Sequence, residues 1–144
     1  MLFSGDLIFN GGTPFLVMGS VAGAVDVLRN VVGPLAPQTI VPGHGEVCGP
    51  EVIDDVLGYL LFVQETAQRA RAAGLSPLAA ARDTDLGEYA GLGDPERIVG
   101  NLHRAYADLD AQAAGGELGT PLNYPAVFAD MVAYNGGKPL TCLA

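Results

Sequence analysis

Residues 39–45 read Thr39-Ile40-Val41-Pro42-Gly43-His44-Gly45, and this stretch decides how the chain is interpreted. Thr39-Ile40-Val41 is a short β-branched run, which is typical of a buried strand. The proline and the two glycines predict that the strand stops there, in a loop that holds one histidine. A histidine held on a loop by a rigid strand suits a metal ligand or a general base. For this loop alone, a turn histidine with a hydrogen-bonded ring is an equally good interpretation.

A carboxylate lies in a comparable setting near the start of the chain. Residues 2–9 predict a strand that is interrupted by a tight turn at Ser4-Gly5-Asp6. Ser20 is a good N-cap for a helix between the two strands, ending at residues 33–34. Because a strand–helix–strand connection is expected to be parallel and right-handed, Asp6 and His44 should lie near each other at the ends of neighbouring strands. Taken alone, a Gly-Asp dipeptide favours an aspartate that hydrogen-bonds its own turn.

The remainder of the chain is mainly helical by pattern. Helices are predicted over residues 50–73, from Ser76-Pro77, over 94–115 and over 123–134, with an exposed acidic loop over 83–93. The two longest helices carry apolar stripes, formed by Ile53, Val56, Leu57, Leu60, Val63 and Ala67 in one and by Val99, Leu102, Tyr106, Leu109 and Ala113 in the other. The order of elements predicts an α/β chain with few strands and several helices.

Composition narrows the class of protein. The 144 residues fit a single domain, and 49% are hydrophobic, so the chain must bury a sizeable core. A formal net charge of −9 argues against a nucleic-acid binder and against binding to an anionic membrane surface. No apolar run is long enough to span a bilayer, and the N-terminal residues do not resemble a signal peptide. Cys48 and Cys142 are expected to be free thiols in a reducing cytoplasm, with one disulfide between them as the open alternative.

Taken together, the two motifs resemble a known family. Leu2-Phe3-Ser4-Gly5-Asp6-Leu7-Ile8-Phe9, the helix from Ser20 and residues 39–45 resemble the C-terminal half of the metallo-β-lactamase-fold hydrolase superfamily. The resemblance implies that Asp6 bridges two zinc ions and that His44 ligates the second. It also implies that residues 1–144 are a single partial domain of an αββα sandwich, with the ligands in residues 1–50 and accessory helices in residues 51–144.

The activity implied by the resemblance is zinc-dependent hydrolysis. In such a centre a metal-activated hydroxide attacks an ester, thioester, lactam or similar bond of a small-molecule substrate. The family's His-x-His-x-Asp-His loop should precede the Gly-Asp strand, but the two histidines of this sequence are His44 and His103. The ligand set is therefore incomplete, as in a fragment, a truncated reading frame or one part of a split protein. We expect the isolated chain to be inactive and to associate with an N-terminal half or with itself.

Two alternatives stay open at the level of function. One is a metallo-β-lactamase-fold cyclase or lyase of a polyketide-type pathway, and the other is a non-catalytic half-domain that assembles with a partner chain. Two further residues are weaker candidates for metal ligation. His103 is more often a histidine at the boundary of a core, and Cys48 is more often a small buried thiol.

Overall fold

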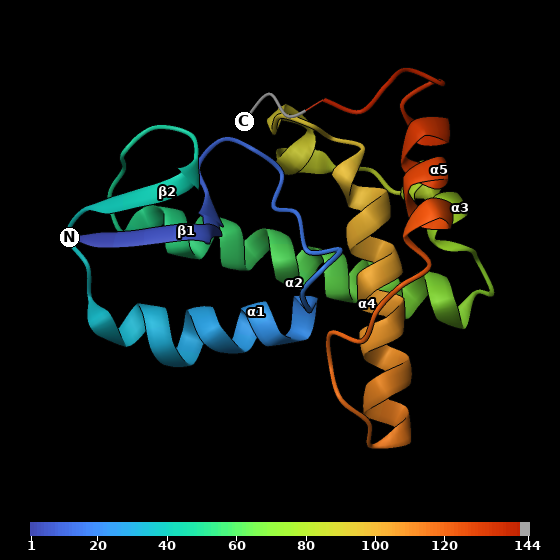
Figure 1. Cartoon of the computed structure of the whole chain (residues 1–144), viewed down its shortest axis with the longest axis horizontal. Helices are drawn as coiled ribbons and strands as arrows, with labels where there is room; N and C mark the ends of the chain where they lie inside the picture. Colours follow the sequence, from blue (N-terminus) through green and yellow to red (C-terminus); the bar gives the residue numbers. More distant parts are fainter. Residues whose placement is uncertain (142–144) are drawn as a thin grey trace.

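The computed structural model describes residues 1–141, which form a mixed α/β fold that is mostly helical (Figure 1). Two strands, β1 (Leu2–Phe9) and β2 (Ile40–His44), pair in parallel. The helices are α1 (Val21–Val27), α2 (Glu51–Ala72), α3 (Pro77–Asp83), α4 (Arg97–Ala114) and α5 (Tyr124–Tyr134). Within residues 1–141, no helix combines the length and the apolar character needed to cross a membrane.

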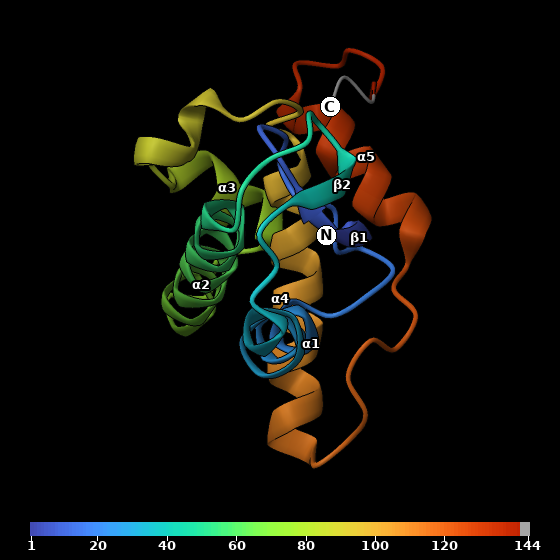
Figure 2. The same cartoon turned by 90° about the vertical axis from the view of Figure 1, so that its left-hand side faces the viewer.

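The small sheet is covered on one side. Helices α1 and α2 lie on the same side of the two strands (Figure 2). The strand side chains Ile8 and Ile40 are fully buried within the core. Phe3 and Leu7 of β1, in contrast, keep 75% and 50% of their surface exposed, and Met1 beside them is also exposed. We call Met1, Phe3 and Leu7 the outer face of the sheet.

Strand β2 is longer than the sequence predicts. The parallel pairing is confirmed, but β2 continues through Pro42 and Gly43 to His44 instead of stopping at Val41. Pro42 pairs with Gly5 of β1, at a register irregularity. Proline is tolerated because β2 is an edge strand, where a missing N–H breaks no ladder on the open side.

Two helix predictions and one loop prediction also need correction. The helix predicted from Ser20 to residue 33 leaves α-helical geometry after Val27, continuing as a π-helical segment over Leu28–Val32 and a 3-10 turn over Gly33–Leu35. Helix α4 begins at Arg97, because Asp94 takes a left-handed backbone conformation with φ of 52°. The predicted loop over 83–93 contains a 3-10 helix over Gly87–Gly91. The helices predicted over 50–73 and 123–134 are confirmed to within two residues.

The buried face of α4 is partly polar. Val99 and Leu102 are buried as predicted, but Ala113 is exposed, and the face includes Asn101 and Arg104, both with no exposed surface. The polar side chains of this face bind the backbone that leads from β1 to α1. Arg97 donates to the Thr13 carbonyl, and Arg104 donates to the Val17 carbonyl. Asn101 bonds to the Pro14 carbonyl and the Leu16 amide. Asp108 accepts from the Ala22 amide and also from the Ser20 hydroxyl. We call these four residues the polar face of α4.

Replacing Asn101 with leucine tests how much this face contributes to stability. Asn101 Oδ1 accepts from the Leu16 amide at 2.9 Å, and Nδ2 donates to the Pro14 carbonyl at 2.8 Å and to the Tyr59 hydroxyl at 3.1 Å. Because the substitution leaves buried polar groups without partners, we expect Asn101→Leu to lower the free energy of unfolding by about 2–4 kcal/mol. Urea denaturation measures the change. The exposed Asn30→Leu is the control, and equal effects of the two would contradict the prediction.

Candidate metal centre

Asp6 and His44 lie side by side on the two paired strands. The distance from His44 Nε2 to Asp6 Oδ1 is 3.7 Å, which confirms that the residues are close. Their positions differ from the prediction in one respect, since Asp6 lies within β1 and only His44 lies at a strand end. The Asp6 side chain is 78% exposed, whereas that of His44 is 24% exposed. The pair therefore sits at the surface, with the imidazole more enclosed than the carboxylate.

Two glycines allow the motifs to approach each other. A Cβ atom at Gly43 would overlap the Asp6 carboxylate and lie 2.7 Å from the Gly5 carbonyl carbon. Gly45 has a φ of +90°, and a Cβ atom there would overlap the carbonyl of Asn10. The Asn10 amide also donates to the His44 carbonyl at 2.9 Å. The glycines of the Pro-Gly-His-Gly stretch are thus required by close backbone packing against β1.

The His44 ring is held by aromatic stacking. It lies parallel to the Phe9 ring, with centroids 4.6 Å apart and planes at 11°. The guanidinium of Arg97 lies 5.6 Å from the centroids of both Phe9 and Phe15. Arg97 also pairs with the buried carboxylate of Asp94 at 2.8 Å, so its charge is balanced locally. The imidazole is thereby oriented by a chain of contacts that starts at the first residue of α4.

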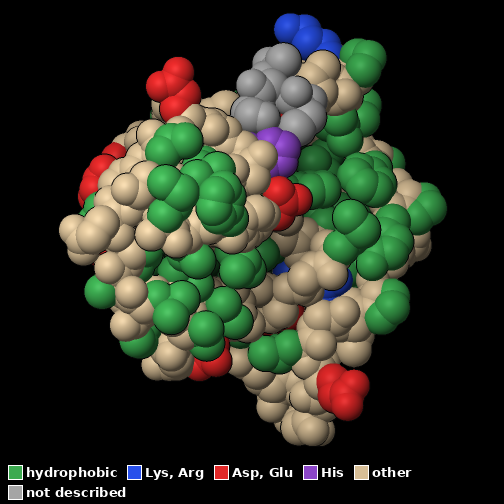
Figure 3. Space-filling model, turned by 60° about the vertical axis from the view of Figure 1, so that its left-hand side comes forward, with side chains coloured by type: hydrophobic (Ala, Val, Ile, Leu, Met, Phe, Trp, Pro, Cys, Tyr) green, Lys and Arg blue, Asp and Glu red, His purple; other side chains and the backbone are tan. Residues whose placement is uncertain are grey.

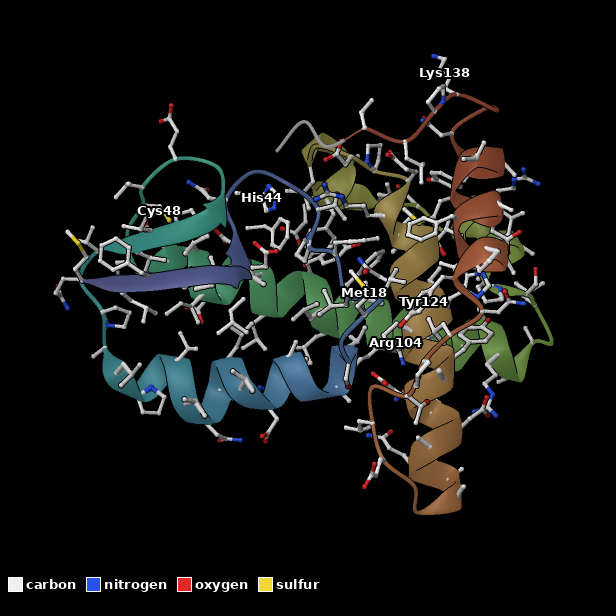
Figure 4. All side chains as sticks on the ribbon, viewed as in Figure 1. Met18, His44, Cys48, Arg104, Tyr124 and Lys138 are labelled. Carbon is white, nitrogen blue, oxygen red and sulfur yellow. The ribbon has the colours of Figure 1, made fainter. Side chains whose placement is uncertain are left out.

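A cavity of about 510 Å³ adjoins the pair. Its walls are mainly apolar, and its polar lining consists of Asp6, His44, Glu96, Arg97 and Thr141. Figure 4 shows His44 at the end of β2. Figure 3 shows hydrophobic side chains gathered on this face of the molecule. Nothing in the local sequence marks Glu96 and Arg97 as site residues, because Asp94-Pro95-Glu96 has the pattern of an ordinary helix start.

The two side chains fit part of a zinc site. Two ligands on one tetrahedral zinc ion lie roughly 3.3 Å apart, for bonds of about 2.0–2.1 Å. The Nε2–Oδ1 distance in this pair is close to that value and needs only a small rotamer adjustment. Among residues 1–141, however, no cluster of three or more histidine, cysteine, aspartate or glutamate side chains is placed to hold a metal ion. A catalytic zinc normally has three protein ligands, so Asp6 and His44 on their own are fewer than that number.

The weaker candidates lie elsewhere. Cys48 bonds with Ile40 through backbone groups at the start of β2, and burial followed by the charge of Glu51 raises the pKa of its thiol, which keeps it protonated. His103 contacts Asp130 at 2.8 Å between α4 and α5. Cys142 lies outside the described residues. Neither Cys48 nor His103 joins a cluster with Asp6 and His44 that could hold a metal ion.

Comparison of the chain with protein-family models and with the curated proteins finds no match.

Substitution of Gly43 tests whether close packing positions Asp6. We expect Gly43→Ala to displace the Asp6 carboxylate and to lower the free energy of unfolding by about 1–3 kcal/mol, because the added methyl overlaps Asp6. NMR resonances of the His44 ring and of Asp6 report the displacement, and thermal denaturation reports the stability. Gly91→Ala is the control, since a Cβ atom there meets nothing within 4 Å. Unchanged His44 resonances in Gly43→Ala would contradict this account.

Proposed function

We propose that this chain is the C-terminal portion of a zinc-dependent hydrolase of the metallo-β-lactamase fold. Asp6 and His44 would hold the metal together with ligands from a further polypeptide segment. The observation that supports this most is the 3.7 Å approach of a carboxylate and an imidazole on adjacent parallel strands. The close packing of Gly43 and Gly45 against β1 adds support, since it explains why glycines flank the histidine.

The residues around the pair suit a small acyl substrate. When bound, the metal would activate water and polarise the bond under attack, as in other zinc hydrolases. Phe9 holds the His44 ring in a fixed plane, which lowers the entropy cost of ligation. The apolar walls of the adjoining cavity would take the non-reacting part of an ester, thioester or lactam and exclude water from it.

Zinc titration of the chain tests the ligand assignment. We expect weak binding, with zinc-dependent shifts in the NMR signals of Asp6 and His44, because two ligands fall short of a catalytic set. His44→Ala and Asp6→Asn should each lower the affinity by about tenfold or more. His103→Ala is the matched control, since His103 already pairs with Asp130, and it should leave the affinity unchanged.

Two outcomes would contradict the ligand assignment. One is zinc binding that survives both substitutions, and the other is a set of zinc-dependent shifts that centres on His103 and Asp130. A third outcome is that the chain alone binds zinc tightly at one-to-one stoichiometry and catalyses hydrolysis, and that His44→Ala abolishes both. This outcome would confirm His44 as a ligand. It would show that another side chain of residues 1–144 completes the site.

A second candidate function is that of a non-catalytic half-domain which assembles with a partner chain. The exposed outer face of the sheet favours it, because Phe3 and Leu7 lie on a two-stranded sheet whose other side is already covered. The DNA upstream of codon 1 separates the two candidates. An in-frame His-x-His-x-Asp-His sequence supports the enzyme, a separate gene carrying it supports the split assembly, and its absence from both overturns the metal proposal.

Substitutions on the outer face test the association. We expect the double variant Phe3→Ser/Leu7→Ser to reduce self-association or binding of an N-terminal half, measured by sedimentation velocity. The side chains are already exposed, so each substitution should change the free energy of unfolding by less than about 0.5 kcal/mol. Val31→Ser/Leu35→Ser removes exposed apolar side chains from the segment between α1 and β2 and is the control. Equal effects of both pairs would show that the outer face is not the interface.

A further inference from the structure

We propose that Glu96 binds a basic nitrogen of a ligand in the cavity beside Asp6 and His44. The cavity would then select an apolar molecule that carries an ammonium group. This inference deepens the proposed function by naming the substrate class, and in that sense it rests on that function. The binding itself needs only residues of this chain and no metal.

Most of Glu96 is enclosed by the fold, and no residue of 1–141 pairs with its carboxylate. Its relative exposure is 4%, and within residues 1–141 no side chain or backbone group bonds to or pairs with its carboxylate. The neighbouring Arg97 is committed to Asp94 at 2.8 Å and to the Thr13 carbonyl at 2.9 Å. A largely enclosed carboxylate without a partner is unfavourable, and a bound cation would supply the missing partner.

The simplest alternative role for Glu96 is to complement the N-terminus of α4. A negative charge is favourable there because of the helix dipole. Glu96 precedes the first residue of α4, but its side chain makes no capping hydrogen bond to the helix. The helix dipole therefore favours the charge at this position, but it leaves the hydrogen-bond acceptors of the carboxylate without a partner in the helix.

Glu96 lines two neighbouring cavities, and its carboxylate oxygens are not fully enclosed. Among the described residues, the fully enclosed side-chain oxygen that lacks a partner is Oδ1 of Asp108, and no Glu96 oxygen shares that condition. The first cavity is the one beside Asp6 and His44, and the second also contacts Lys138. Figure 4 shows Lys138 extending outward at the upper edge of the molecule, away from His44. Glu96 therefore belongs to the wall of the first cavity, and no described residue bonds to its carboxylate.

The rest of the cavity defines the body of the ligand. The volume of about 510 Å³ suits a small organic molecule. The apolar walls are Phe9, Phe15, Met18, Phe128, Met131 and Leu140. Phenylalanine rings and methionine thioethers favour flat or aromatic groups. Together with the Glu96 carboxylate, these walls specify an aryl or alkyl amine.

Three matched probes test the proposal on the whole chain, with a chelator present to keep metal out. They are 4-phenylbutylamine, 4-phenylbutan-1-ol and 4-phenylbutanoate, which share one apolar body and differ in charge. We expect the amine to bind about tenfold or more tightly than the alcohol, and the carboxylate to bind most weakly, because a charge-assisted hydrogen bond forms only with the amine. In the unmodified chain, the amine should shift the amide NMR signals of Glu96, Arg97 and Met131.

Variants then locate the acid that is responsible. Glu96→Gln should lower the affinity for the amine by about tenfold and leave that for the alcohol unchanged, with circular dichroism confirming the fold. Glu88→Gln is the matched control, because Glu88 lines a separate cavity of about 500 Å³ together with Asp55. Lys138→Met should also leave the affinity unchanged. Tighter amine binding in that variant would mean that Lys138 pairs with the Glu96 carboxylate in the unmodified chain, which would contradict the proposal.

Three further outcomes would overturn the proposal. They are equal affinities for the amine and the alcohol, amide shifts centred on Glu88, and no loss of amine affinity in Glu96→Gln. The amide shifts in the unmodified chain decide the matter even where Glu96→Gln does not fold. Because the chelator removes metal, a failure of zinc binding at Asp6 and His44 leaves this result unaffected, and a failure of amine binding leaves the zinc titration unaffected.

Discussion

The polar face of α4 is the interaction on which the rest of the structure depends. Arg97, Asn101, Arg104 and Asp108 bind successive backbone groups of residues 13–22. Arg104 has no exposed surface, and it donates to the Val17 carbonyl at 2.7 Å and to the Thr120 carbonyl at 2.8 Å. Hydrogen bonds to charged groups contribute about 1.5–3 kcal/mol each. The irregular segment after β1 can be buried because α4 satisfies its carbonyls and amides.

The same face links the helices to the candidate metal centre. Arg97, at the start of α4, lies against both Phe9 and Phe15, and Phe9 stacks on the His44 ring. The position of the imidazole is therefore fixed from the helical side of the molecule as well as by β2. A change at the first turn of α4 would reach His44 through the contacts of Arg97 with Phe9 and of Phe9 with His44.

Sequence patterns predict those parts of this molecule that follow from periodicity and local chemistry. The apolar spacing of residues 53–67 locates α2, and the parallel connection brings Asp6 and His44 together. The polar face of α4 has no such signal, because Asn101 and Arg104 look like solvent-facing residues until their partners, more than 80 residues away, are known. Glu96 was likewise hidden in an ordinary helix start, since burial by distant elements leaves no mark on the local sequence.

In the proposed function, one added layer of polypeptide would cover both the exposed Asp6 carboxylate and the exposed apolar side chains of β1. The Asp6 carboxylate is 78% exposed, and a zinc ligand this open would be strongly hydrated. On the same strand, Phe3 and Leu7 leave apolar surface in contact with water. A polypeptide packed against the outer face of the sheet would cover Phe3 and Leu7, and it would bring its own ligands beside Asp6. The apolar burial would then supply the free energy for assembly, and the metal would bind only once assembly had placed the remaining ligands.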